Sequence, residues 1–184
     1  MDHKEEVEEL IEAIRKNYQE MQDIVLQSPA ELFLHSMHFD SQMTPPPIFE
    51  QYAVPYFKDF CGRLIEKGKW LTVHQDADAA LLLNLYLEAK IQVVDCFACA
   101  PMVTCRFEDA IHTWNKSVVI WGAIPSILLC PMCVSEEELE EHLTTIFDNA
   151  EKGRIILAVS DNVMPETDIN SLKKITEKVN SYQP

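Results

Sequence analysis

The chain has 184 residues, 47% of them hydrophobic, which is enough for one globular domain with a sizeable core. Its 30 acidic residues outnumber its 15 basic residues and give a formal net charge of -15. This charge argues against nucleic acid or an anionic membrane as a main partner, because both repel an acidic protein. The chain has no apolar run of transmembrane length, and its start does not resemble a secretion signal, so we expect a cytoplasmic location.

The first expected element is an amphipathic helix that ends near Pro29, because apolar residues recur at steps of three and four opposite a row of glutamates. A short strand at residues 32–34 and a long polar loop follow. Residues 48–67 have a helical pattern that contains Pro55, which predicts two helical pieces with Gly68 as the stop.

Strands and helices then alternate to the end of the chain. Further strands are expected from Trp70 to His74 and at residues 91–95, 117–121 and 154–159, and helices at residues 79–88, 107–114, 135–152 and 169–180. Ser135 and Glu138 match a capping box at the start of one of these helices. Such alternation indicates an α/β fold of parallel strands joined by right-handed crossovers, either as an open sheet or as a barrel.

Polar or otherwise distinctive residues stand where the five strands end. They are His38 and Asp40, then His74, Asp76 and Asp78, then Asp95, then Trp121, and finally Asp161. In parallel α/β folds the chemistry sits at the carboxyl ends of the strands. Histidine with carboxylates at alternate strand positions can bind a divalent metal or perform acid and base chemistry. The structural alternative is that Asp76 or Asp78 caps the next helix while His74 forms a hydrogen bond in the core.

Other strand-end residues also have two interpretations. His38 with Asp40 can complete a site with His74, or can cap a loop. Asp95 can orient the His74 ring, or can cap a loop itself. Trp121 can stack on a flat ligand, or can pack in the interior of the fold.

Six cysteines in a chain without a secretion signal indicate reduced thiols or metal ligands, not a disulfide framework. Two CxxC pairs, Cys96 with Cys99 and Cys130 with Cys133, have a spacing that can make a four-sulfur zinc or iron site. The alternative is that they are apolar cysteines without a metal, since neither pair contains the glycine that usually lets a zinc-binding loop turn.

Five short segments, taken in order, carry a resemblance to a known family. They are Thr44-Pro45 with Phe49, Tyr52 and Pro55-Tyr56; Val73-His74-Gln75-Asp76; residues 98–102; residues 120–125; and residues 160–168. Over residues 31–179 the chain resembles the carboxyl-terminal part of the uroporphyrinogen decarboxylase superfamily, which includes cobalamin-dependent methyltransferases. The resemblance implies that residues 1–184 form a single domain with about five strands of a TIM-type barrel, its site at the carboxyl ends of the strands.

The methyltransferase branch holds zinc through a His-x-Cys pair on one strand and a cysteine on the last strand. These ligands fall on His74, Asp76 and Asp161, so the histidine is kept and two sulfur ligands are replaced by oxygen ligands. The resemblance implies a methyltransferase-like enzyme subunit that uses zinc or another divalent metal. It also implies a corrinoid (cobalamin) carried by a partner protein, with Trp121 as a weak candidate for contact with the corrinoid ring.

Two other functions are open. The decarboxylase branch binds a highly carboxylated tetrapyrrole and needs cationic groups, whereas Arg106 is the only arginine near a strand end. A non-catalytic barrel remnant that binds a tetrapyrrole or a partner is the other alternative. Because a full barrel of this family has eight strands, we expect self-association or a missing amino-terminal barrel half that covers the open edges.

Overall fold

The computed structural model describes residues 3–36, 39–75 and 77–183. Its five strands form one sheet in the chain order β1-β2-β3-β4-β5, and every neighbouring pair is parallel. The strands are β1 (Leu32–His35), β2 (Trp70–His74), β3 (Val93–Phe97), β4 (Val119–Pro125) and β5 (Arg154–Ser160). The predicted α/β architecture of five consecutive parallel units, a partial TIM-type barrel, is confirmed.

Helices alternate with these strands, as the sequence predicts. They are α1 (Lys4–Gln27), α2 (Pro46–Ile48), α3 (Val54–Glu66), α4 (Leu83–Glu88), α5 (Phe107–Trp114), α6 (Glu136–Asn149) and α7 (Ile169–Ser181). The capping box is present, because the Ser135 side chain accepts a hydrogen bond from the Glu138 backbone and the Glu138 side chain accepts one in return.

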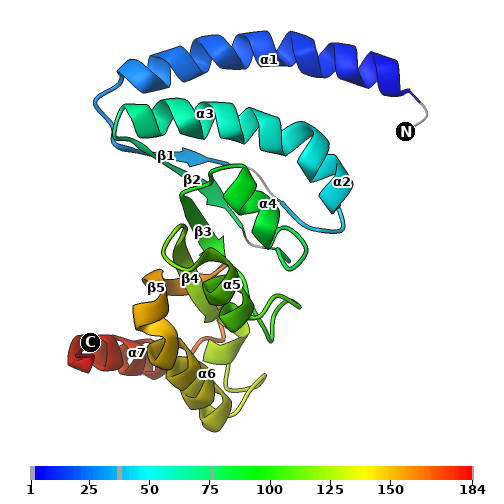
Figure 1. Ribbon diagram of the computed structural model, residues 1–184. Coiled ribbons are helices and arrows are strands. Elements are labelled where there is room, and N and C mark those ends of the chain that lie inside the picture. The colour runs from blue at the N-terminus through cyan, green and yellow to red at the C-terminus, as the bar shows by residue number, and fades with distance from the viewer. Residues whose placement is uncertain (1–2, 37–38, 76, 184) are drawn as a thin grey trace.

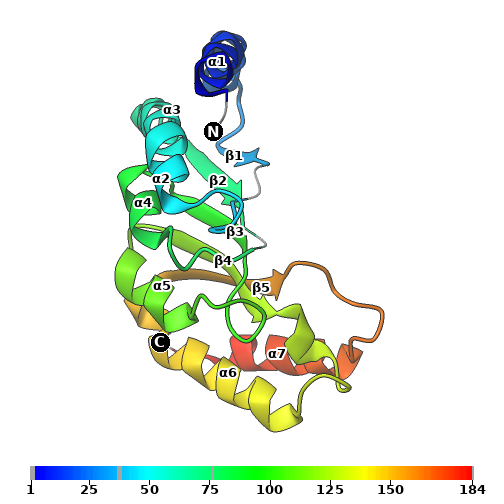
Figure 2. The same ribbon diagram turned by 90° about the vertical axis from the view of Figure 1, so that its right-hand side faces the viewer.

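One face of the sheet is packed against helices. Figure 2 shows α3, α4 and α5 along this face, where the strands contribute buried apolar residues such as Leu71, Val73, Val94 and Ile120. Aromatic side chains join the sheet to the helices, since the Tyr86 and Trp114 rings stack with centroids 5.8 Å apart. The core of the described chain therefore lies between the sheet and this layer of helices.

The opposite face of the sheet carries large apolar side chains that are exposed to solvent. Strand register places Leu32 beside Trp70, and Trp121 beside Ile156, on this face. The exposed fractions are 46% for Leu32, 59% for Leu34, 39% for Trp70 and 47% for Ile156. We call it the open face; it corresponds to the interior of a closed barrel.

Helix α1 lies alongside α3 at the β1 end of the molecule (Figure 1). Arg63 of α3 connects the two helices, because its guanidinium donates to Gln22 Oε1 at 3.0 Å and to the Asp23 carboxylate. Three large apolar side chains of α1, at Leu10, Met21 and Ile24, remain at least half exposed. Helix α1 is therefore held to the molecule mainly through one side.

Several predicted boundaries differ from the structure. The expected break in residues 48–67 is a π-helical turn at Phe49–Ala53, which joins α2 to α3, and Pro55 is the second residue of α3. The helix expected at residues 79–88 begins only at Leu83, after a turn. Strand β4 continues to Pro125, so Trp121 lies inside the strand and the prediction that it ends the strand was wrong.

Strand β3 contains an irregularity that the sequence did not predict. Its register against β4 shifts between Val94 and Phe97, so that one extra residue fits into β3. Gly122 permits this close approach: it has a φ of +139°, and a Cβ there would lie 2.6 Å from the Phe97 backbone nitrogen. Residues 96 and 97 therefore belong to the strand, which ends later than the expected residue 95.

We expect Gly122→Ala to lower the free energy of unfolding by about 2 kcal/mol or more, because alanine adds both a clash and an unfavourable φ. Chemical denaturation measures this change. Gly62→Ala is the matched control, since a Cβ at Gly62 meets only the Lys90 amine at 3.9 Å in the interior of α3. The control should be neutral or stabilising by up to about 1 kcal/mol; an equal loss in both variants would contradict the role given to Gly122.

Candidate functional site at the carboxyl edge of the sheet

His74 and Asp95 lie side by side at the carboxyl ends of β2 and β3. They are register partners, and His74 Nδ1 lies 3.1 Å from Asp95 Oδ2. A carboxylate can only accept a hydrogen bond, so Nδ1 carries the proton and donates it. Both side chains are partly exposed, at 35% for His74 and 24% for Asp95. The structure thus places Asp95 as the group that orients the His74 ring, one of the two interpretations given to it from the sequence.

The residue after His74 anchors this end of β2. The buried Gln75 side chain donates to the Phe39 carbonyl at 2.5 Å and to the Ala77 carbonyl at 2.8 Å, and it accepts a hydrogen bond from the Tyr86 hydroxyl. The loop after β1, the end of β2 and helix α4 therefore meet at one side chain. The sequence analysis gave Gln75 no role. Its position between an apolar strand and the polar residues that end this strand is the feature that could have indicated one.

Asp161 lies just after β5 and contacts β3 across the end of β4. Its backbone N–H donates to Cys96 Sγ at 2.8 Å, and its carboxylate accepts a hydrogen bond from the Asn162 side chain at 3.0 Å. Both Asp161 and Cys96 have a left-handed backbone, with φ values of 62° and 59°. Such a backbone is costly for residues other than glycine and often marks a functional site. Cys96 therefore places a sulfur atom beside Asp161 at the carboxyl edge of the sheet.

Asp78 and Asp40 hold loops in place. Asp78 Oδ1 accepts hydrogen bonds from the Ala80 and Cys105 backbones, each at 3.1 Å, and its other oxygen accepts one from the Thr104 hydroxyl. Asp40 Oδ1 accepts hydrogen bonds from the two backbone N–H groups that follow in its loop, at 2.6 and 3.1 Å. For these two carboxylates the structural interpretation fits the contacts, as turn and loop caps.

Two predicted site residues, His38 and Asp76, lie outside the described residues. Within the described ranges, no three His, Cys, Asp or Glu residues are arranged so that they could hold a metal ion. The four-sulfur alternative is therefore not formed, since Cys96, Cys99, Cys130 and Cys133 are all described. Cys99 instead contacts the Ala123 carbonyl at 3.6 Å.

Trp121 lies partly exposed on β4, beside the exposed Ile156 of β5. By register it is on the open face, the same face as His74 and Asp95. The indole ring is thus available to a flat ligand in the region that a closed barrel would enclose.

Carboxylates outnumber cationic side chains in the segments that follow the strands, taken together, at residues 36–45, 75–82, 98–106, 126–135 and 161–168. Together they contain six carboxylates and one cationic side chain, Arg106. Arg106 is paired with Glu108 at 2.8 Å. This composition suits a cation better than a polyanionic ligand.

An incomplete parallel barrel with polar groups at its strand ends defines the class of this protein. A profile of the family described as uroporphyrinogen decarboxylase (URO-D) matches residues 1–182. The chain therefore belongs to the uroporphyrinogen decarboxylase family, and the predicted superfamily is confirmed. A comparison with curated proteins gave no match. None of the described helices has the length and apolar character needed to span a membrane.

We expect Tyr86→Phe to lower the free energy of unfolding by about 1 to 3 kcal/mol, because it leaves the buried Gln75 oxygen without its hydroxyl donor. Tyr52→Phe is the control, since that hydroxyl binds the partly exposed Glu8 carboxylate at 3.0 Å and its loss should cost about 0.5 kcal/mol or less. Urea denaturation of the two variants makes the comparison. Equal small losses of unfolding free energy in the two variants would show that the hydrogen bond from Tyr86 to Gln75 does not stabilise the fold.

Proposed function

We propose that the chain is a methyltransferase-like enzyme subunit in which a divalent metal such as zinc, bound at His74, assists methyl transfer that involves a corrinoid. The observation that carries the proposal is the contact between His74 and Asp95 at the carboxyl edge. Histidine ligands of zinc commonly donate their second ring N–H to a carboxylate, which fixes the tautomer and the ring orientation. With Nδ1 bound to Asp95, Nε2 of His74 is the nitrogen that can bind the metal.

The donor set fits a metal in part. His74 supplies an oriented imidazole, and the proposed ligands Asp76 and Asp161 are carboxylates that zinc accepts. Asp76 lies outside the described residues, and the described residues alone do not form a three-ligand group. When bound, the metal would act as a Lewis acid that favours the deprotonated form of a nucleophile.

Charge favours this proposal over decarboxylation of a carboxylated tetrapyrrole. The strand-end segments carry six carboxylates, and their single arginine is already paired. A ligand with several carboxylates would be repelled there, whereas a divalent cation would be attracted. The location of Trp121 on the same face supports contact with a flat macrocycle.

The first test measures metal directly. Wild-type protein should bind about one zinc ion per chain, and His74→Ala should abolish the binding because the oriented nitrogen is lost. Asp95→Ala should weaken the affinity by about 10 to 100-fold, since the ring is no longer held. Elemental analysis after dialysis and titration with a zinc indicator give both values.

His112→Ala is the matched control for the zinc test. His112 lies exposed on α5, away from the strand ends, so its loss should leave zinc binding unchanged. The metal proposal would be wrong if the wild-type chain binds no metal and the His74→Ala variant folds as the wild type does. The non-catalytic barrel remnant would then be the better description of this chain.

Methyl transfer itself is tested with methylcobalamin. The zinc-loaded chain should remove the methyl group in the presence of an acceptor nucleophile, seen as a change in the visible spectrum, and His74→Ala should lose at least tenfold in rate. Turnover of a porphyrinogen with no effect on methylcobalamin would favour the decarboxylase alternative instead.

The open face supports a further part of the proposal: the chain associates with itself or with a complementary barrel half. Four large apolar side chains lie exposed on the open face, at Leu32, Leu34, Trp70 and Ile156, and exposed apolar patches mark interaction sites. The edge strands β1 and β5 also present unpaired backbone groups along their outer sides. A cytoplasmic location remains a prediction.

We therefore predict that the purified chain does not sediment as a monomer at micromolar concentration. Leu34→Lys together with Ile156→Lys should shift the population toward monomer, because the charges oppose burial of the open face. Analytical ultracentrifugation at several concentrations measures the change. A cooperative, soluble monomer for the unmodified chain would refute this prediction.

A further inference from the structure

A tight turn between β4 and α6 brings two cysteines together. Cys130 ends the 3₁₀ turn Ser126–Leu129, and the Cys133 backbone N–H donates to the Cys130 carbonyl at 2.9 Å. The Val134 backbone N–H donates to the same carbonyl at 3.2 Å, so the turn keeps the two cysteines close, and a hydrogen bond with the Cys130 side chain raises the pKa of the Cys133 thiol. The sequence Cys-Pro-Met-Cys is thus folded as a vicinal dithiol.

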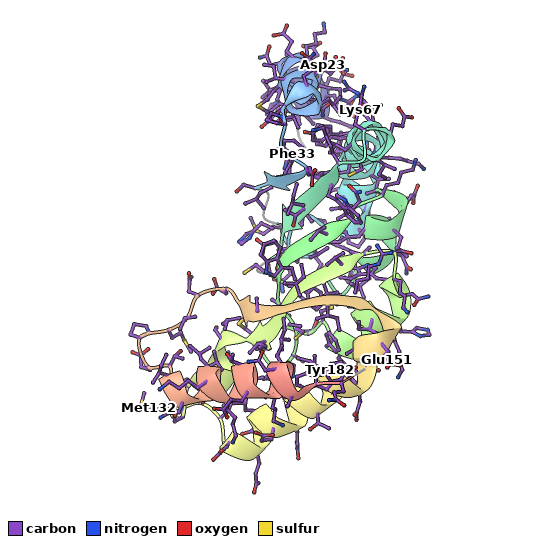
Figure 3. The ribbon with its side chains drawn as sticks, turned by 90° about the vertical axis from the view of Figure 1, so that its left-hand side faces the viewer. Asp23, Phe33, Lys67, Met132, Glu151 and Tyr182 are labelled. Atoms are coloured by element: carbon purple, nitrogen blue, oxygen red, sulfur yellow. The ribbon has the colours of Figure 1, made fainter. Side chains whose placement is uncertain are left out.

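The two thiols differ in access. Cys130 is buried, at 2% exposure, whereas Cys133 is exposed to solvent. Met132, labelled in Figure 3, projects from the outer side of the same turn with 82% of its surface exposed. A reagent in solution can therefore reach Cys133 first, with Cys130 directly behind it.

The other cysteines of the chain lack this arrangement. All six lie in the described residues, and Cys133 is the exposed one. Burial raises the pKa of Cys61 and of Cys105 to about 12, and it raises the pKa of Cys99 further. Those three thiols are buried as well, so a reagent in solution does not reach them as it reaches Cys133.

We propose that Cys130 and Cys133 form a reversible dithiol–disulfide pair that reacts with low-molecular-weight disulfides, with Cys133 attacking first and Cys130 resolving. The proposal is independent of the metal and methyl-transfer chemistry proposed for His74.

The low-molecular-weight disulfide RSSR is itself the oxidant in this exchange, so the reaction needs no other. The Cys133 thiolate attacks a disulfide RSSR, forms a mixed disulfide and releases one thiolate, which takes up a proton as RSH. The Cys130 thiol then loses its proton and attacks the Cys133 sulfur, which releases the second RSH. Two cysteine thiols and RSSR become one protein disulfide and two RSH.

The pair lies beside the start of α6 and a surface groove. Ser135, the N-cap of α6, follows two residues after Cys133, and the Asp168 backbone N–H donates to the Leu129 carbonyl at 3.0 Å. Pro131 lines a groove of about 590 Å³ between the starts of α6 and α7. A disulfide would lock this wall of the groove at the carboxyl edge of the sheet.

The test uses the full chain and oxidised glutathione. After reduction and desalting, the protein is incubated with excess oxidised glutathione, quenched with N-ethylmaleimide and digested with trypsin. The peptide of residues 117–152 contains Cys130 and Cys133 and no other cysteine. We expect this peptide to lose two hydrogen atoms and to carry no label, and dithiothreitol should restore two labelled thiols.

Two variants separate the roles of the cysteines. Cys130→Ser should accumulate a glutathione adduct on Cys133, because the resolving thiol is gone. Cys133→Ser should give at least tenfold less adduct on Cys130, because that thiol is buried. The tryptic peptide of residues 59–63, which carries the buried Cys61 as its one cysteine, serves as the internal control and should remain unmodified until the protein is denatured.

Two results would overturn the proposal. One is a wild-type peptide that keeps two free thiols under conditions in which the denatured chain is oxidised. The other is a stable glutathione adduct on Cys133 of the wild type with no internal bridge. Neither result bears on zinc binding at His74, so failure here is distinguishable from failure of the proposed function.

Discussion

The close approach of β3 and β4 at Phe97 and Gly122 is the constraint on which the candidate site depends. The extra residue in β3 allows Asp95 to remain the register partner of His74 while the next residue, Cys96, reaches Asp161 beyond the end of β4. Bulges often redirect side chains beside functional sites. Without a glycine at position 122, the strands could not approach closely enough for the Phe97 backbone to fit.

The parallel order of the strands also determines where the helices and the loops of the chain lie. Every crossover returns over the same face, so α3, α4 and α5 cover that face and the loops gather at the carboxyl edge (Figure 2). Some polar residues at this edge hold the loops, as Asp78 and Gln75 do, and others face the open side, as His74 does. Asp78, which holds a loop, and the candidate ligand His74 thus lie within a few residues of each other and differ in what they contact.

The carboxyl edge of the sheet has an acidic part and an uncharged part that carries two thiols. Around the ends of β2, β3 and β5 the carboxylates outnumber cations, which suits a bound metal ion. After β4 the segment from Ser126 to Ser135 has no charged residue and carries the contacting thiols of Cys130 and Cys133. Because the two groups lie on different loops, each can act without the chemistry of the other.

The sequence by itself determined the order of elements and the capping box at Ser135, because hydrophobic periodicity and local hydrogen-bonding signals are short-range properties. The family followed from the resemblance of short segments of the sequence to a known family. It also indicated the edge at which His74, Asp95 and Asp161 would stand. Only the tertiary structure decided that Asp95 contacts His74, that Asp78 holds the loop at Thr104 and Cys105, and that Cys96 meets Asp161. These pairings depend on strand register and on the bulge at Gly122, which are set by packing between segments far apart in the chain.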